Sequence, residues 1–238
     1  MTRREKSGGT KGLRRPPGEP PRVRDLPKPR RSPSFIGPLF RTLFAWPYRV
    51  VLAGLYRAGF LPWQLTLLSV VANGAVGWLI VTGRFFVPGL LLVFSGMLDV
   101  FDGGLARLRG EASRAGAFLD SVSDRVSDVI LFGALFWALA GQGHVLPAAL
   151  ALSALVVSLM VSHVRAEAEA LGPSLTEGFI QRLERYVLLV IGLTTPHALL
   201  PVLILLNSLG GLTVLQRTYS AWQQLGGKAR PHLPRRAK

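Results

Sequence analysis

The sequence contains no cysteine and only four histidines, so several classes of functional site are excluded at the outset. Without cysteine the chain has no disulfides, no thiolate metal ligands and no thiol nucleophile. The four histidines are scattered singly rather than grouped. Acidic residues are also scarce, 13 against 28 lysines and arginines, so the places where they gather are informative.

Apolar residues, in contrast, are abundant. They make up 49% of the chain and raise the mean hydropathy to +0.35, which is unusual for a soluble protein. A helix needs roughly 20 mostly apolar residues to cross the hydrocarbon layer. Six segments qualify, at approximately 64–83, 85–106, 117–140, 145–166, 186–201 and 199–221. We therefore predict an all-α integral membrane protein with six transmembrane helices, or five if the last two segments merge.

Residues 35–60 precede these spans and have a different pattern. Arg41, Arg49 and Arg57 recur every eight residues among aromatic and aliphatic side chains, which keeps the charges near one helical face. This pattern predicts an N-terminal amphipathic helix that lies in the membrane interface. Three aromatic residues are interpreted as interfacial anchors: Trp46, Tyr48 and Trp222.

The loops between the predicted spans differ sharply in charge. On one side they carry several arginines, among them Arg107, Arg114 and Arg182, whereas the loops on the other side carry Arg84 alone. Lysine and arginine are retained in cytoplasmic loops. We therefore expect a multi-pass protein of the cell membrane with both termini and the site described below on the cytoplasmic side.

Much of the net charge of +15 comes from the N-terminal region, since residues 1–31 hold eleven of the 28 lysines and arginines. This region is rich in proline and glycine and poor in apolar residues, so it predicts a disordered tail without a secretory signal. We predict a basic tail over 1–33, a membrane domain over 34–222 and a basic tail over 223–238. Anionic lipid is a better partner for such a tail than nucleic acid, and no nucleic acid partner is expected.

Five of the six aspartates fall within thirty residues, inside or beside predicted membrane helices. A carboxylate in a membrane helix is costly and usually serves a function. Asp99 and Asp102 share one helical face, as do Asp120 and Asp124. Four converging carboxylates need cations, and ligation by oxygen alone favours Mg²⁺ or Mn²⁺. We expect two ions, the arrangement used in phosphoryl chemistry.

The residues around these aspartates fit a phosphate ligand. Gly103, Gly104 and Gly116 allow a ligand or another backbone to approach closely. Arg107, at the cytoplasmic end of the same predicted helix, could reach a pyrophosphate.

The stretch from Asp99 to Asp124 resembles the signature of the CDP-alcohol phosphatidyltransferase family. Eight defined positions match over 26 residues: Asp99, Asp102, Gly103, Ala106, Arg107, Gly116, Asp120 and Asp124. The resemblance implies transfer of a phosphatidyl group from CDP-diacylglycerol to an alcohol, with release of CMP, by a protein that forms a homodimer.

The resemblance also implies roles for individual residues. The four aspartates would hold the metal ions, with Asp124 also acting as the general base on the acceptor alcohol. Gly103, Arg107 and Ser113 would contact the CDP group. Pro62 and Thr66, where relatives contact the nucleotide, could do so too, although the start of a helix explains them equally well.

Three later segments, Ser162–Ala170, Gly178–Arg185 and Gln216–Arg217, resemble segments of the phosphatidylinositol phosphate synthases of actinobacteria and of their archaeal relatives. By that resemblance Arg165, Arg185 and Arg217 would bind the phosphate of a phosphorylated polyol, with inositol phosphate ahead of glycerol phosphate. Glu167 and Gln181 depart from that branch, which usually has arginine and glutamate at these positions. Anionic lipid headgroups would also satisfy the three arginines.

Other interpretations compete with the transferase. A metal or proton transporter also uses intramembrane carboxylates, but it tends to spread them over several helices and to show internal repeats. A prenyltransferase with paired acidic motifs leaves Gly103, Arg107 and Gly116 unexplained. Asp128 lies one turn beyond Asp124, and we expect it to make a supporting hydrogen bond or to pair with Arg125 rather than to bind metal.

Overall fold

The computed structural model describes residues 44–173, 175 and 178–226, and within these ranges the chain forms seven helices. Their bounds are α2 Ala45–Arg57, α3 Pro62–Val81, α4 Phe86–Arg109, α5 Arg114–Gly141, α6 Val145–Leu171, α7 Arg182–Thr194 and α8 Leu199–Gly226. The predicted tail over 1–33, residues 35–43 of the predicted interfacial segment and residues 227–238 of the tail predicted over 223–238 lie outside the described residues. Residues 223–226, predicted as tail, continue α8.

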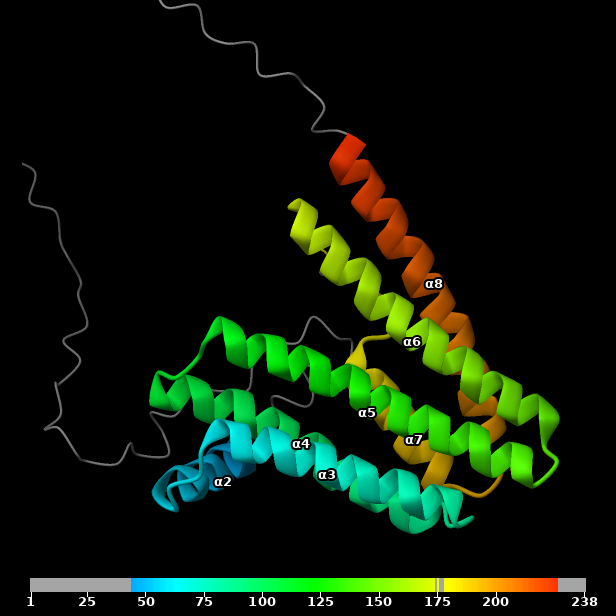
Figure 1. Ribbon diagram of the computed structural model, residues 1–238, viewed down its shortest axis with the longest axis horizontal. Coiled ribbons are helices and arrows are strands. Elements are labelled where there is room, and N and C mark those ends of the chain that lie inside the picture. The colour runs from blue at the N-terminus through cyan, green and yellow to red at the C-terminus, as the bar shows by residue number, and fades with distance from the viewer. Residues whose placement is uncertain (1–43, 174, 176–177, 227–238) are drawn as a thin grey trace, which may run out of the picture.

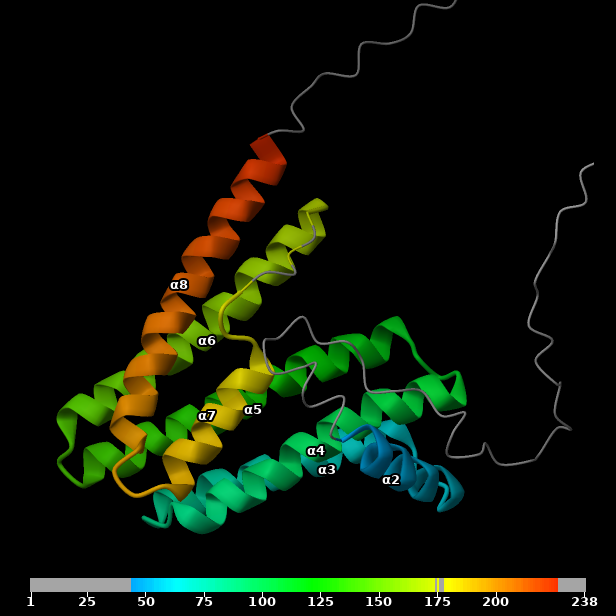
Figure 2. The same cartoon turned by 180° about the vertical axis from the view of Figure 1, so that it is seen from behind.

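The contacts among α3 to α8 form a closed circuit (Figure 1). α3 packs against α4 and α5, α4 against α7, α7 against α8, α8 against α6, and α6 against α5. α2 lies outside this circuit and packs against α4. Seen from behind, α6 and α8 run side by side and project beyond the other helices (Figure 2). Every helix of the circuit thus has two neighbours that can contribute to a shared site.

Four of these helices are long and apolar enough to cross a membrane: α3, α4, α6 and α8. They coincide with four of the six predicted spans, so the prediction of an all-helical membrane protein is confirmed. α5 has 28 residues, but it carries Asp120, Asp124 and Asp128 along its length up to the midpoint of the helix. α7 has only 13 residues, about 20 Å of helix, and ends where Thr195 and Pro196 interrupt the chain.

The larger hydrophobic cluster and most of the buried polar residues occupy opposite halves of the circuit. The larger hydrophobic cluster draws on the second halves of α3, α5 and α7 and the first halves of α4, α6 and α8. Most buried polar residues lie in the complementary halves or near the middle of a helix, for example Ser69 on α3, Asp102 on α4 and Arg217 on α8. Since consecutive helices alternate in direction, one end of the bundle is apolar and the other is polar.

α2 is fixed to the polar end by aromatic stacking and by a close approach to α4. The ring of Tyr48 stacks on Phe101 with 5.3 Å between centroids. A Cβ on Gly104 would lie 2.0 Å from the Tyr48 hydroxyl oxygen, so only glycine permits this contact. The prediction that Tyr48 is an interfacial anchor is therefore wrong, because its side chain is buried against α4. Trp46 and Trp222, in contrast, are exposed.

Candidate active site

Three of the four predicted metal ligands converge at the polar end of the bundle. Asp99 on α4 and Asp120 and Asp124 on α5 each offer a carboxylate oxygen, and these oxygens lie within 4.8 Å of one another. Asp120 is exposed, while Asp99 and Asp124 are partly buried. The two helices meet here because Gly110, in a left-handed conformation (φ 71°), ends α4 and lets the chain turn into α5.

Asp102, the fourth predicted ligand, is directed toward α3. It is buried, and its Oδ2 accepts a hydrogen bond of 2.6 Å from the Thr66 hydroxyl. The backbone N–H of Gly103 donates to its other oxygen. Among the described residues, the group of three carboxylates does not include Asp102. Thr66 is thus more than a residue at a helix start, because it links α3 to the acidic motif.

Arg182, the first residue of α7, supplies the positive charge of this site. Its Nη1 lies 2.7 Å from Oδ2 of Asp99 and also forms an ion pair with Asp124. Its guanidinium carbon lies 5.2 Å from the ring centroid of Tyr186, one turn further along α7. A single arginine therefore joins α4, α5 and α7 through opposite charges in a partly buried setting.

Sequence reasoning missed this role for Arg182, which it used only as a marker of topology. A usable signal was present, because clustered carboxylates in membrane helices need counter-charges. Arg182 stands just before the predicted span 186–201, on the same side of the membrane as the acidic motif. What the sequence could not supply was the contact between α4 and α7, which brings Arg182 to Asp99 across 83 positions.

The residues predicted to contact the nucleotide border the acidic group. Arg107 lies over Gly103, since a Cβ there would be 3.4 Å from Nη1 of Arg107. Ser113 caps α5, and its hydroxyl oxygen accepts a 3.0 Å hydrogen bond from the N–H of Gly116. Pro62 opens α3, and its carbonyl accepts a hydrogen bond from the Thr66 hydroxyl. These contacts explain the local structure without requiring a ligand.

Arg185, one of three arginines predicted to bind an acceptor phosphate, is buried beside Asp128. Its Nη1 lies 3.5 Å from Oδ2 of Asp128 and donates to the carbonyl and hydroxyl oxygens of Ser158 on α6. The Ser158 hydroxyl donates in turn to Asp128, at 2.5 Å. The expected supporting hydrogen bond of Asp128 is confirmed, but its charged partner is Arg185. Arg125 instead donates to Ser121, one turn back on α5.

Arg217 lies within electrostatic range of the other two predicted arginines. Arg217 on α8 is buried and donates a 2.9 Å hydrogen bond to the carbonyl of Val161. The positive charges of Arg165 and Arg185 both act on it. Arg165 is about half exposed and forms an ion pair of 2.8 Å with Glu169 on the same helix. The three predicted arginines thus come together from α6, α7 and α8.

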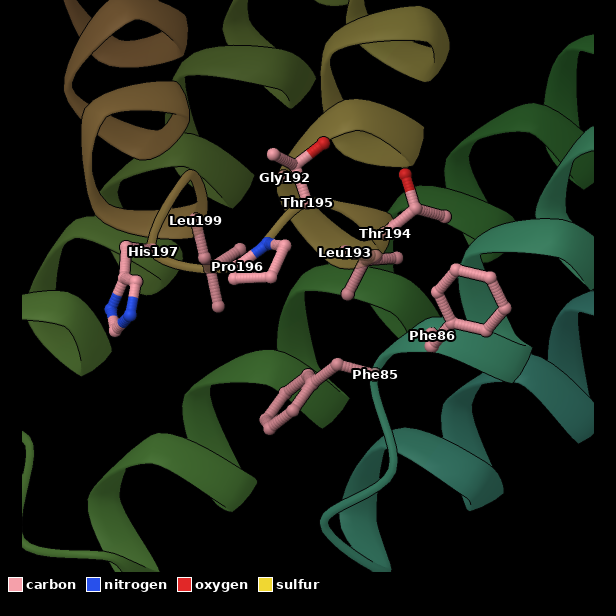
Figure 3. Close-up of a pocket in the computed structure, with 9 residues that line it drawn as sticks. All are labelled: Phe85, Phe86, Gly192, Leu193, Thr194, Thr195, Pro196, His197 and Leu199. Carbon is pink, nitrogen blue, oxygen red and sulfur yellow. The ribbon is translucent and has the colours of Figure 1, made fainter.

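A separate cavity of about 320 Å³ lies at the apolar end of the bundle (Figure 3). Phe85 and Phe86 at the start of α4 and the turn between α7 and α8, including His197, line it. Thirteen residues separate Phe86 from Asp99, which is about 20 Å along α4. The walls are mainly apolar, so this cavity plays no part in the polar site.

Comparison with known proteins identifies the family. The profile of the CDP-alcohol phosphatidyltransferase family matches residues 59–219. Phosphatidylinositol phosphate synthase of Mycobacterium tuberculosis is 33% identical over 207 residues, which cover 82% of this chain and 95% of the relative. Archaetidylinositol phosphate synthase of Methanothermobacter thermautotrophicus is 37% identical over 150 residues, covering 60% and 74%. The chain belongs to the CDP-alcohol phosphatidyltransferase family and is an enzyme of that class.

Solved structures agree with this assignment. The crystal structure of the M. tuberculosis phosphatidylinositol phosphate synthase with CDP-DAG bound aligns with a TM-score of 0.69 and 32% identity, covering 77% of this chain and 97% of that one. The same enzyme in complex with manganese and citrate aligns with a TM-score of 0.65 and 32% identity, covering 72% and 87%. The resemblance predicted from the acidic motif is confirmed.

The Arg182 ion pairs yield a prediction about stability. In a chelating buffer, Arg182→Gln should lower the thermal unfolding midpoint, because Asp99 and Asp124 lose their shared counter-charge; the expected loss is on the order of 1–3 kcal/mol. Arg125→Gln is the matched control, since Arg125 bonds only within α5 in the contacts described above. Equal midpoints for the two variants would contradict the role assigned to Arg182.

Proposed function

We propose that this enzyme transfers the phosphatidyl group of CDP-diacylglycerol to a hydroxyl of inositol phosphate and releases CMP. The observation that carries the proposal is the placement of two charged groups side by side in one bundle. The three carboxylates of α4 and α5 offer a site for metal-assisted phosphoryl chemistry. The three arginines of α6, α7 and α8 offer a site for an anionic acceptor.

We propose that Asp99, Asp102, Asp120 and Asp124 hold two divalent ions, Mg²⁺ or Mn²⁺. The donor set fits these ions, because it consists of carboxylate oxygens and three of them already lie within 4.8 Å of one another. The manganese in the M. tuberculosis relative supports the same assignment. When bound, the ions would polarise the reacting phosphate and hydroxyl oxygens and neutralise the carboxylates.

In the proposed reaction Asp124 acts as the general base. Its carboxylate takes the proton of the acceptor hydroxyl, and the resulting alkoxide attacks the phosphorus nearer the diacylglycerol. A new oxygen–phosphorus bond forms as the bond from that phosphorus to the CMP oxygen breaks, and CMP leaves with the electron pair. The ion pair with Arg182 favours the ionised form of Asp124, which is the form that a base requires.

The residues that border the carboxylates would bind the nucleotide. Arg107 presents its guanidinium beside Gly103, where a pyrophosphate could accept hydrogen bonds without obstruction by a side chain. Ser113, Pro62 and Thr66 would complete the nucleotide site from the ends of α5 and α3. CDP-DAG is bound by the M. tuberculosis relative, which supports this donor.

Arg165, Arg185 and Arg217 would bind the phosphate of the acceptor. Their mutual repulsion is relieved when a dianion lies among them. Inositol phosphate is the leading acceptor because the relatives named above are phosphatidylinositol phosphate and archaetidylinositol phosphate synthases. Glycerol phosphate, as in phosphatidylglycerophosphate synthesis, is the alternative, since the same arginines would recognise its phosphate.

We also propose a membrane arrangement for the domain over residues 34–222. α5 and α7 would cross together with the four apolar helices, giving six spans, and α2, which carries the exposed Trp46, would lie in the interface. The arginine-rich loops support cytoplasmic termini and a cytoplasmic site. In this arrangement the site would meet the membrane lipid donor and a soluble acceptor at one surface. Family resemblance supports a homodimer.

The acceptor assignment predicts a clear order of substrates. Purified enzyme supplied with CDP-diacylglycerol and Mg²⁺ or Mn²⁺ should release CMP with a higher kcat/KM for inositol phosphate than for glycerol phosphate, inositol or glycerol. A chelator should abolish release in every case. Highest activity with an unphosphorylated alcohol would contradict the proposed role of the three arginines, and no CMP with any acceptor would contradict the transferase itself.

The base assignment predicts that Asp124→Asn lowers kcat by about 10²–10⁴-fold, because the amide cannot take the hydroxyl proton. The KM for CDP-diacylglycerol should change far less. Ser123→Ala, at the preceding position of α5, is the matched control and should retain wild-type kcat. Wild-type turnover by a folded Asp124→Asn enzyme would show that another group removes the proton.

A further inference from the structure

Asp128 is a buried carboxylate for which the proposed reaction has no use. It is 3% exposed, on α5, one turn beyond Asp124. The family signature ends at Asp124, so the family motif does not account for it. A buried carboxylate is expensive unless charged or hydrogen-bonding partners compensate it. The burial of Asp128 therefore calls for an explanation, and its contacts indicate one.

Asp128 and Ser158 both contact one side of the Arg185 guanidinium. Nη1 of Arg185 lies 3.5 Å from Asp128 and donates to both oxygens of Ser158. The Ser158 hydroxyl donates to Asp128, at 2.5 Å, which closes a small network among α5, α6 and α7. All three residues are at least nine-tenths buried. The orientation of Arg185 is thus determined by two partners on two other helices.

The other side of the Arg185 guanidinium has donor capacity left. Its Nε is buried and has no hydrogen-bond partner among the residues that the structure describes. An unpaired buried donor is costly, and the cost is removed when an acceptor such as a phosphate oxygen binds there. Arg185 also repels the nearby Arg217, which a bound anion would relieve. The site is therefore built for an anion, with Arg185 preset by its neighbours.

The placement of Asp128 also relates this anion site to the proposed chemistry. Asp124 and Asp128 lie four residues apart on the same face of α5, about 6 Å along the helix axis. The first would receive the proton of the attacking hydroxyl, and the second holds the arginine that would bind the acceptor phosphate. One rigid helix would thus set the separation between the two ends of a small polyol phosphate.

We infer that Asp128, together with Ser158, is a positioning residue that orients Arg185 and so sets the preference for a phosphorylated acceptor. This inference rests on the proposed function, because it assumes that Arg185 binds the acceptor phosphate. It assigns Asp128 a role in acceptor affinity rather than in metal binding or proton transfer. The competing explanation is an ion pair that serves helix packing alone.

The test compares Asp128→Asn and Ser158→Ala with Ser127→Ala. Ser127 is as deeply buried as Ser158 and accepts a 2.9 Å hydrogen bond from Asn73, so its loss removes a buried contact between helices without touching Arg185. Steady-state CMP release, with the thermal unfolding midpoint measured in parallel, gives kcat and the two KM values for each enzyme. Two variants at one site keep the test decisive if Asp128→Asn fails to fold.

The expected result is a rise of about 10- to 100-fold in the KM for inositol phosphate in Asp128→Asn and Ser158→Ala, since hydrogen bonds to a charged group are lost. The KM for CDP-diacylglycerol and kcat should stay within about twofold of wild type. In an Arg185→Ala background, adding Asp128→Asn should raise the KM no further, because the residue it positions is gone.

Two results would overturn the inference while leaving the proposed function intact. One is an unchanged KM for inositol phosphate in a folded Ser158→Ala or Asp128→Asn enzyme. The other is an equal rise in Ser127→Ala, which would assign the effect to packing. If instead the wild-type enzyme shows no preference for inositol phosphate over inositol, the proposed acceptor is wrong and the inference fails with it.

Discussion

The polar end of this bundle depends on the arginine and serine side chains that pair with its carboxylates. Without these partners, carboxylates would be excluded from membrane helices. Arg182 joins Asp99 on α4 to Asp124 on α5, and Arg185 and Ser158 compensate Asp128 one turn further along. Uncompensated carboxylates in such a setting would be protonated or would destabilise the helices. Because the partners come from α6 and α7, the same interactions that make the acidic cluster tolerable also hold the helices around it in place.

The carboxylates and their charged partners all lie in the polar half of the bundle. α5 has a leading part in it, since Asp120, Asp124 and Asp128 follow one another at intervals of one turn on one face. Asp120 lies beside Asp99 of α4. Asp124 lies beside Arg182 of α7, and Asp128 beside Ser158 of α6. A lipid-linked donor and a soluble acceptor could meet there without either crossing the apolar half, where buried leucine, isoleucine and alanine side chains fill the interior.

Sequence reasoning reached the local features more readily than the partners. Hydropathy located α3, α4, α5, α6 and α8 to within about five residues but carried the span of α7 past its end at Thr194. The spacing of Asp99, Asp102, Asp120 and Asp124 identified the family. It missed the burial of Tyr48, because aromatic residues near arginines also suit an interface and only the packing of α2 on Gly104 decides between them. It also missed Arg182 and the pairing of Asp128 with Arg185, since both depend on which helices become neighbours, and periodicity within one helix carries no such information.

Binding of Mn²⁺, followed by electron paramagnetic resonance on the purified enzyme, tests the central claim most directly, because it reports on the carboxylates without requiring the right acceptor. The account predicts saturable binding of about two ions per chain, weakened strongly in Asp99→Asn and Asp120→Asn and retained in Asp128→Asn. Absence of saturable binding to the wild-type enzyme, or equal binding by Asp120→Asn, would contradict the assignment of these carboxylates as the metal site.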